Sequence, residues 1–189
     1  MISREPTIER LALAKGLLLT PFGLDETHLA RALGEIKAHQ VDEADLYFQY
    51  TRSEGWSLEE GIVKTGSFSI DQGVGVRAVS GEKTAFAYSD DISEASLLDA
   101  ARTVRTISSA AQKGRTKVAS AKIARARSLY NGVDPISTLD SAAKVALLGK
   151  VEKLARAKDP RVAQVMAGLA SEYDVVMVAR ADGTLAADV

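Results

Sequence analysis

The chain has 189 residues, of which 46% are hydrophobic and 26% charged, and its formal net charge is −1. This balance is typical of a soluble globular protein, and the near-neutral charge excludes a global field that would draw the chain onto nucleic acid or an anionic membrane. Because the sequence lacks cysteine, disulfides, thiolate metal sites and cysteine nucleophiles are excluded within it. With no signal-peptide pattern and no long apolar run, we expect a cytoplasmic protein without a membrane partner.

Two helices are predicted in the first forty residues. Thr7 can cap the first, which Gly16 would end, and Asp25 can cap the second. Helical spacing defines an apolar stripe on each, with Ile8, Leu11 and Ala12 on the first and Leu29, Ala32, Leu33 and Ile36 on the second.

After residue 41 the apolar residues alternate, which predicts β-strands. The segment 45–51 reads as a strand, 53–55 as a turn and 56–62 as its partner. A second hairpin is predicted from strands 74–78 and 84–88 with a turn at 80–82.

Two more helices are predicted in the second half of the chain. Asp91 with Glu94 resembles a capping box, and Ser137 with Asp140 marks a second start, for a helix that ends at 158–160. The stripes expected to be buried are Leu97, Ala101, Val104 and Ile107 or Ser108 on the earlier helix, which would stop before Gly114, and Ala143, Leu147, Val151 and Leu154 on the later one.

The last thirty residues return to strands. Segments 162–169 and 173–179 are predicted to flank a break at 171–172, and Asp182-Gly183 predicts a hairpin turn before 184–189. Because native proteins protect apolar edge strands, we expect the chain to be truncated there.

The order of elements predicts an α+β fold, with antiparallel β-meanders or hairpins packed against amphipathic helices. We divide it into an N-terminal helical segment, 1–40, and an α+β domain, 41–189.

The segment Gly73–Ala78 matches the G-x-G-x-x-A pattern of dinucleotide-binding turns. That mechanism requires a helix to begin directly after the turn, and here the alternation continues to Gly81. The pattern therefore favours a strand whose glycines allow another backbone to approach closely, and a nucleotide-binding enzyme is the weakest functional alternative.

No catalytic, cofactor-binding or metal-binding residue is predicted in this chain. His28 and His39 are eleven positions apart, about three helical turns, so one metal cannot bridge them. Glu59-Glu60 would point to opposite faces of a strand, and Asp90-Asp91 sit where a helix start favours negative charge.

Six lysines and arginines lie between residues 113 and 127 with no acidic residue among them. Such a run could contact phosphates, but no aromatic residues are interleaved for base stacking. The run favours a solvated linker, and nucleic acid is not an expected partner.

Several motifs resemble one family in the same order along the chain. They are 45–49 (DLYFQ), 69–78 (SIDQGVGVRA), 80–84, 86–88, 128–130, 133–135 and 182–189 (DGTLAADV). This part of the chain is similar to the amino-terminal domain of the TldD/PmbA family, also called modulators of DNA gyrase. Residues 1–40 match only loosely.

The resemblance implies a subunit of a zinc metallopeptidase that acts on extended or unfolded peptides, such as microcin and antitoxin precursors. It also implies a heterodimer with a TldE/PmbA-like subunit. The family's zinc motif, His-Glu-x-x-x-His with a later cysteine, is absent here, so no catalytic residue can be transferred. Zinc is expected only in the full-length protein.

Our first hypothesis is therefore a substrate-gating and assembly domain, with the strand edge at 184–189 as a place where a peptide or neighbouring strand could add. The alternative is a stand-alone binding module for gyrase or nucleic acid that uses the basic run 113–127.

Overall fold

The computed structural model describes residues 5–39, 41–107, 122–124 and 132–189. Contacts divide the chain into two compact units. Unit 1 comprises residues 1–50, 71–131 and 175–189, and unit 2 comprises 51–70 and 132–174. Each unit is described by itself below.

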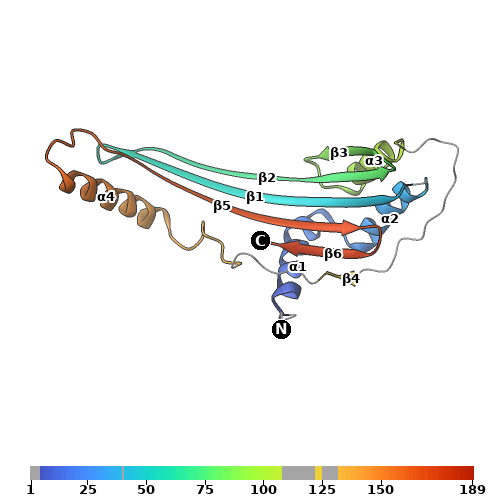
Figure 1. Ribbon diagram of the computed structural model, residues 1–189. Helices are drawn as coiled ribbons and strands as arrows, with labels where there is room; N and C mark the ends of the chain where they lie inside the picture. Colours follow the sequence, from blue (N-terminus) through green and yellow to red (C-terminus); the bar gives the residue numbers. More distant parts are fainter. Residues whose placement is uncertain (1–4, 40, 108–121, 125–131) are drawn as a thin grey trace. The chain divides into compact units, whose positions relative to one another are not determined.

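The sheet contains six strands in the order β3-β2-β1-β5-β6-β4 (Figure 1). Three strands are long and contribute residues to both units: β1 (Glu43–Glu59), β2 (Ile62–Ser80) and β5 (Met166–Arg180). The others are β3 (Lys83–Ser89), β4 (Lys122–Ile123) and β6 (Thr184–Asp188). β2–β3 and β5–β6 are antiparallel, whereas β4 lies parallel to β6. Together with four α-helices this confirms the predicted α+β class, while the parallel pair was not foreseen.

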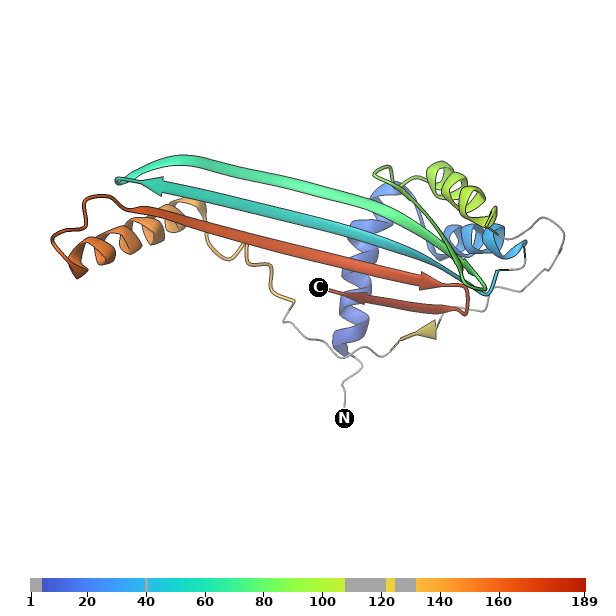
Figure 2. The ribbon, with the colours of Figure 1, turned by 45° about the horizontal axis from the view of Figure 1, so that its top comes forward.

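Unit 1 holds a conventional apolar core. Helices α1 (Glu5–Leu18), α2 (Glu26–Lys37) and α3 (Glu94–Arg105) belong to it, with a short 3-10 turn, η1 (Thr20–Phe22), between the first two (Figure 2). The predicted stripe on α2 is buried, and so are Leu97, Ala101 and Val104 on α3, which ends at Arg105 and therefore before the predicted Ile107. Strand side chains of the same unit, such as Phe48 and Val76, are also fully buried.

Of these two predicted helix starts, one is confirmed and the other lies at a different cap residue. Asp25 caps α2 as expected, accepting from the backbone N–H groups of Thr27 and His28. For α3 the cap is Ser93 rather than Asp91, whose carboxylate instead accepts the hydroxyls of Ser93 and Ser96.

The first helix differs from its prediction. α1 begins before Thr7 and continues through Gly16 to Leu18. Ile8 is exposed, and the buried stripe is Leu11, Ala14 and Leu18. Gly16 has open space around it, so it neither ends the helix nor fills a tight contact.

The predicted turns at 53–55 and 171–172 are wrong, because β1 and β5 run through them without interruption. Gly55 is a strand residue: a Cβ there would lie 2.9 Å from the Ser67 hydroxyl of the neighbouring β2. The β1–β2 turn lies at Glu60-Gly61, where both residues have positive φ (51° and 73°). The turns at 80–82 and Asp182-Gly183 are confirmed.

Unit 2 consists of the remaining halves of β2, β1 and β5, and helix α4 (Ser141–Lys158). Asp140 caps α4 by accepting from the backbone N–H of Ala143 at 2.7 Å. The helix ends at Lys158, before Asp159-Pro160, as predicted.

The buried face of α4 is rotated by about a quarter turn from the predicted one. Lys144, Leu148 and Glu152 point into unit 2, while Leu147, Val151 and Leu154 are exposed. Two of the three inward side chains carry charge, so polar anchors rather than apolar packing set the rotation of this helix.

Candidate functional site

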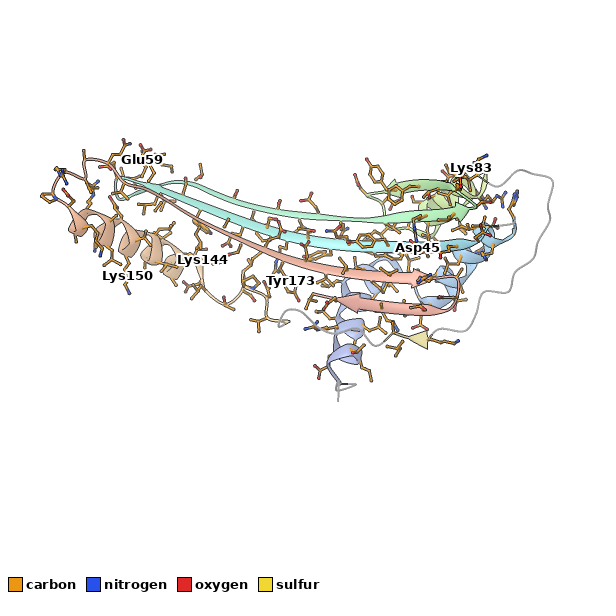
Figure 3. The ribbon with its side chains drawn as sticks, viewed as in Figure 1. Asp45, Glu59, Lys83, Lys144, Lys150 and Tyr173 are labelled. Atoms are coloured by element: carbon orange, nitrogen blue, oxygen red, sulfur yellow. The ribbon has the colours of Figure 1, made fainter. Side chains whose placement is uncertain are left out.

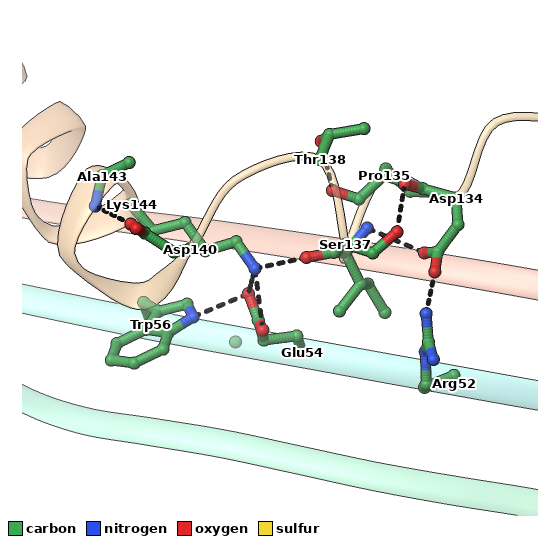
Figure 4. Close-up of polar contacts among 12 residues, drawn as sticks. Arg52, Glu54, Trp56, Asp134, Pro135, Ser137, Thr138, Asp140, Ala143 and Lys144 are labelled. Atoms are coloured by element: carbon green, nitrogen blue, oxygen red, sulfur yellow. Dashed lines mark hydrogen bonds and ion pairs between the residues drawn. The ribbon is translucent and has the colours of Figure 1, made fainter.

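A largely covered polar cluster lies in unit 2, between strand β1 and the start of α4 (Figure 4). Arg52, Glu54 and Trp56 alternate along β1, so their side chains share one face of the strand. The segment that leads into α4 supplies Asp134 and the Ile136 carbonyl, and the helix supplies Lys144.

Lys144 is the centre of this cluster, with only 4% of its side chain exposed. Its ammonium group lies 2.7 Å from Glu54 Oε1, donates to Glu54 Oε2 at 2.9 Å and donates to the Ile136 carbonyl at 2.7 Å. An ammonium group has three N–H donors, and these three acceptors use all of them.

Both oxygens of the Glu54 carboxylate accept hydrogen bonds, because Trp56 Nε1 donates to Oε1 at 2.7 Å. The Lys144 hydrogen bond, assisted by Trp56, lowers the pKa of Glu54 below its usual value of 4.5. A carboxylate held ionised, with each oxygen already accepting, is a poor proton acceptor for a substrate. This arrangement suits a structural anchor rather than a general base.

Arg52 extends the cluster. It pairs with Asp134, and its guanidinium carbon lies 5.9 Å from the centre of the Tyr173 ring. The Asp134 carboxylate also accepts the Ile136 backbone N–H at 2.9 Å, so it orders the turn that presents the Ile136 carbonyl to Lys144. Arg52 and Glu54 therefore hold two successive parts of the 134–144 segment against one strand.

A second polar cluster lies near the C-terminal end of α4. Arg156 donates to Glu152 at 3.2 Å and to Glu60 at 2.6 Å, and Glu60 also accepts the Val165 backbone N–H at 2.8 Å. The Val165 hydrogen bond, with help from Arg156, lowers the pKa of Glu60. Glu59 instead accepts from Gln164 at 2.7 Å, and Glu60 lies in the turn after β1 rather than on the strand as predicted.

The two histidines do not meet. His28 belongs to the α2 cap, with Nδ1 2.7 Å from Asp25 Oδ1 and Nε2 3.8 Å from Glu94, whereas His39 follows the other end of that helix. Within the described ranges no group of three or more histidine or acidic side chains could hold a metal ion. These residues therefore do not fit a zinc site of the kind that the family resemblance implies.

The glycine-rich segment Gly73–Ala78 is part of strand β2, in register with β3. A Cβ on Gly75 would lie 2.8 Å from the Phe86 ring, and one on Gly73 would lie 2.9 Å from the Ser89 carbonyl oxygen. The glycines are thus explained by close approach, as expected, and the nucleotide-binding alternative lacks the helix that it needs.

The hypothesis that 184–189 forms an open strand edge is wrong for the first two residues of this strand. β4 pairs with β6, Lys122 with Thr184 and Ile123 with Leu185, so this side of the edge is covered there. Sequence reasoning missed β4 because two residues carry no periodic signal. Apart from residues 122–124, the basic run 113–127 lies outside the described residues, and its role stays a prediction.

None of the described helices has the length and apolar character needed to cross a membrane.

Two family models match this chain. Residues 44–110 match "PmbA/TldA metallopeptidase domain 1" and residues 134–189 match the "PmbA/TldA metallopeptidase central domain". The chain belongs to the PmbA/TldD family. The central-domain match includes the whole 134–144 anchor segment and α4, and the strand residues Arg52, Glu54 and Trp56 lie in the domain 1 match.

Curated relatives agree. A "Metalloprotease TldD homolog" from Haemophilus influenzae is 44% identical over 172 residues, and one from Buchnera aphidicola (Schizaphis graminum) is 37% identical over 179 residues. These matches cover 91% and 95% of this chain but only 36% and 37% of the relatives. The chain thus spans little more than a third of the length of these proteins.

Solved structures share the fold. TldE from Thermococcus kodakarensis superposes with a TM-score of 0.60 at 17% identity, covering 86% of this chain and 36% of that one. A proposed modulator of a DNA gyrase from Thermotoga maritima gives a TM-score of 0.64 at 16% identity, with 86% and 36% coverage.

Proposed function

We propose that this chain is the substrate-gating and assembly part of a PmbA/TldD-type zinc metallopeptidase, and that it carries no catalytic residue of its own. The observation that carries the proposal is the pair of family matches over residues 44–110 and 134–189, found in a chain with no cysteine and two separated histidines. The metal ligands and the hydrolytic chemistry are assigned to the remainder of the full-length protein.

In this proposal the described residues have a structural role and keep α4 fixed within its unit. The anchors at Glu54–Lys144 and Glu60–Arg156 fix both ends of α4, and their carboxylates are already engaged, which suits a rigid wall. By analogy with the family, the full-length enzyme cleaves extended or unfolded peptides of the microcin or antitoxin-precursor type, pairs with a TldE/PmbA-like subunit and works in the cytoplasm.

The test compares the full-length protein with this 189-residue chain on an unstructured peptide, with zinc supplied or removed by a chelator. We expect cleavage only by the full-length protein and its loss with the chelator. Equilibrium dialysis should show that the 189-residue chain does not bind zinc stoichiometrically. Stoichiometric zinc binding with peptide cleavage by the 189-residue chain would refute the proposal.

A further inference from the structure

Helix α4 exposes its apolar side chains and buries its charged ones. Leu147, Val151 and Leu154 are 42%, 45% and 56% exposed, whereas Lys144 and Glu152 are 3% and 7% exposed. The three exposed residues follow an i, i+4, i+7 spacing and so form one continuous stripe. An amphipathic helix that packed only against its own unit would bury this stripe.

The polar anchors keep the stripe outside. Lys144 uses all three of its donors on Glu54 and Ile136, and Glu152 is paired with Arg156. Successive residues of a helix are about 100° apart, so turning Leu147 inward would withdraw Lys144 from its acceptors and leave the Glu54 carboxylate buried with its lysine missing. The exposed stripe is therefore a fixed feature of the native helix.

The charges beside the stripe have one sign. Lys150, Lys153 and Lys158 are exposed, and Figure 3 shows Lys150 pointing away from the sheet. The acidic residue within α4, Glu152, is turned inward, so no carboxylate of the helix itself offsets these lysines on its exposed side. Lys150 lies one turn from Leu147 and borders the stripe on the side away from the buried face, and Lys158 lies one turn beyond Leu154, in line with the stripe.

We propose that the exposed face of α4 (Leu147, Val151 and Leu154, flanked by Lys150 and Lys158) is a docking surface for an acidic amphipathic helix of a partner polypeptide. Leucine or similar side chains of the partner would cover the stripe, and its flanking carboxylates would pair with the lysines. The inference adds a surface and a partner chemistry to the assembly role proposed above, and binding measurements test it without reference to peptide cleavage.

Charge complementarity selects this occupant over two others. A second copy of the chain would bring lysines against lysines, which opposes association. A lipid surface favours helices that are strongly amphipathic along their whole length, whereas α4 is only weakly amphipathic and turns Lys144 and Glu152 to its buried side.

The probe is a synthetic helical peptide with leucines at i, i+4 and i+7 flanked by glutamates, and its control is a scrambled peptide of equal composition. Binding to the 189-residue chain is measured by fluorescence anisotropy. We expect the amphipathic peptide to bind at least about tenfold more tightly than the scrambled one, with an affinity that falls as salt is raised.

Two matched pairs of variants locate the site. Val151→Glu should weaken binding about tenfold, because it places a repelling charge in the stripe, while Val133→Glu, at a 58% exposed site in the same unit, should leave it unchanged. Lys150→Glu should weaken binding about fivefold, and Lys83→Glu, at an exposed turn, should not. Circular dichroism checks that each variant keeps its helix content.

Equal affinity for the two peptides, or unchanged affinity in a folded Val151→Glu variant, would overturn the proposal. Preferential binding to phosphatidylglycerol vesicles would replace it with a membrane role. Self-association that Val151→Glu abolishes, without peptide binding, would replace it with a homodimer interface. None of these outcomes alters the result expected for peptide cleavage by the full-length protein.

Discussion

The two units use opposite rules to hold a helix against a sheet. In unit 1, α3 buries Leu97, Ala101 and Val104, an apolar stripe that its sequence displays openly. In unit 2, α4 buries Lys144 and Glu152 beside Leu148 and leaves its apolar stripe outside. The comparison shows that the apolar face of a helix need not pack against the sheet of its own unit.

The largest expected effect comes from a substitution that breaks the ion pair between Lys144 and Glu54 in unit 2. Lys144→Met should lower the free energy of unfolding by about 3 kcal/mol, because it leaves the largely covered Glu54 carboxylate without its cation. The double variant Lys144→Met with Glu54→Leu removes both charges and should recover much of that loss. Chemical denaturation measures all three proteins. If the single variant is as stable as the parent, the pair is not an anchor.

The next effect contrasts leucines on the two helices. Leu97→Ala on α3 should cost about 3 kcal/mol, because the side chain is 1% exposed and a cavity replaces it. Leu154→Ala on α4 should change the free energy of unfolding by less than about 0.5 kcal/mol, since that residue is 56% exposed. Similar losses for both variants would mean that α4 buries its apolar stripe in solution.

The smallest effect is a dependence on pH. The folded-state pKa of Glu54 lies below its usual value of 4.5, so its contribution to stability is fully present above that value and is lost as the pH falls through the lowered pKa. Glu54→Gln removes this contribution. Denaturant unfolding at pH 7 and below pH 4 should therefore show a shallower acid loss in Glu54→Gln than in the parent. Parallel pH profiles would contradict the pairing.

The sequence predicted well those elements whose signal is local and whose apolar face meets the core. The stripes of α2 and α3 and the turns at 80–82 and 182–183 are of this kind. The sequence-based predictions were wrong where a residue's contacts come from a distant part of the sequence. Gly55 read as a turn because its neighbour across the sheet, Ser67, could not be known.

The candidate site shows the same limit. The sequence predicted no catalytic or metal-binding residue, and it gave no sign of the anchor, because Glu54 and Lys144 are 90 positions apart. The helical pattern of α4 located an apolar stripe but wrongly predicted that it packs against the sheet of its own unit. The alternating Arg52, Glu54 and Trp56 on one strand face were the one available signal, since a strand that presents charge to its covered side requires a counter-charge there.

The contact between Trp56 and Gly66 has a consequence for how this family can vary. A Cβ at position 66 would lie only 3.1 Å from the indole ring, so the indole occupies the space that a side chain on the neighbouring strand would need. Substitutions at the two positions should therefore covary, with any bulkier residue at 66 accompanied by a slimmer one at 56.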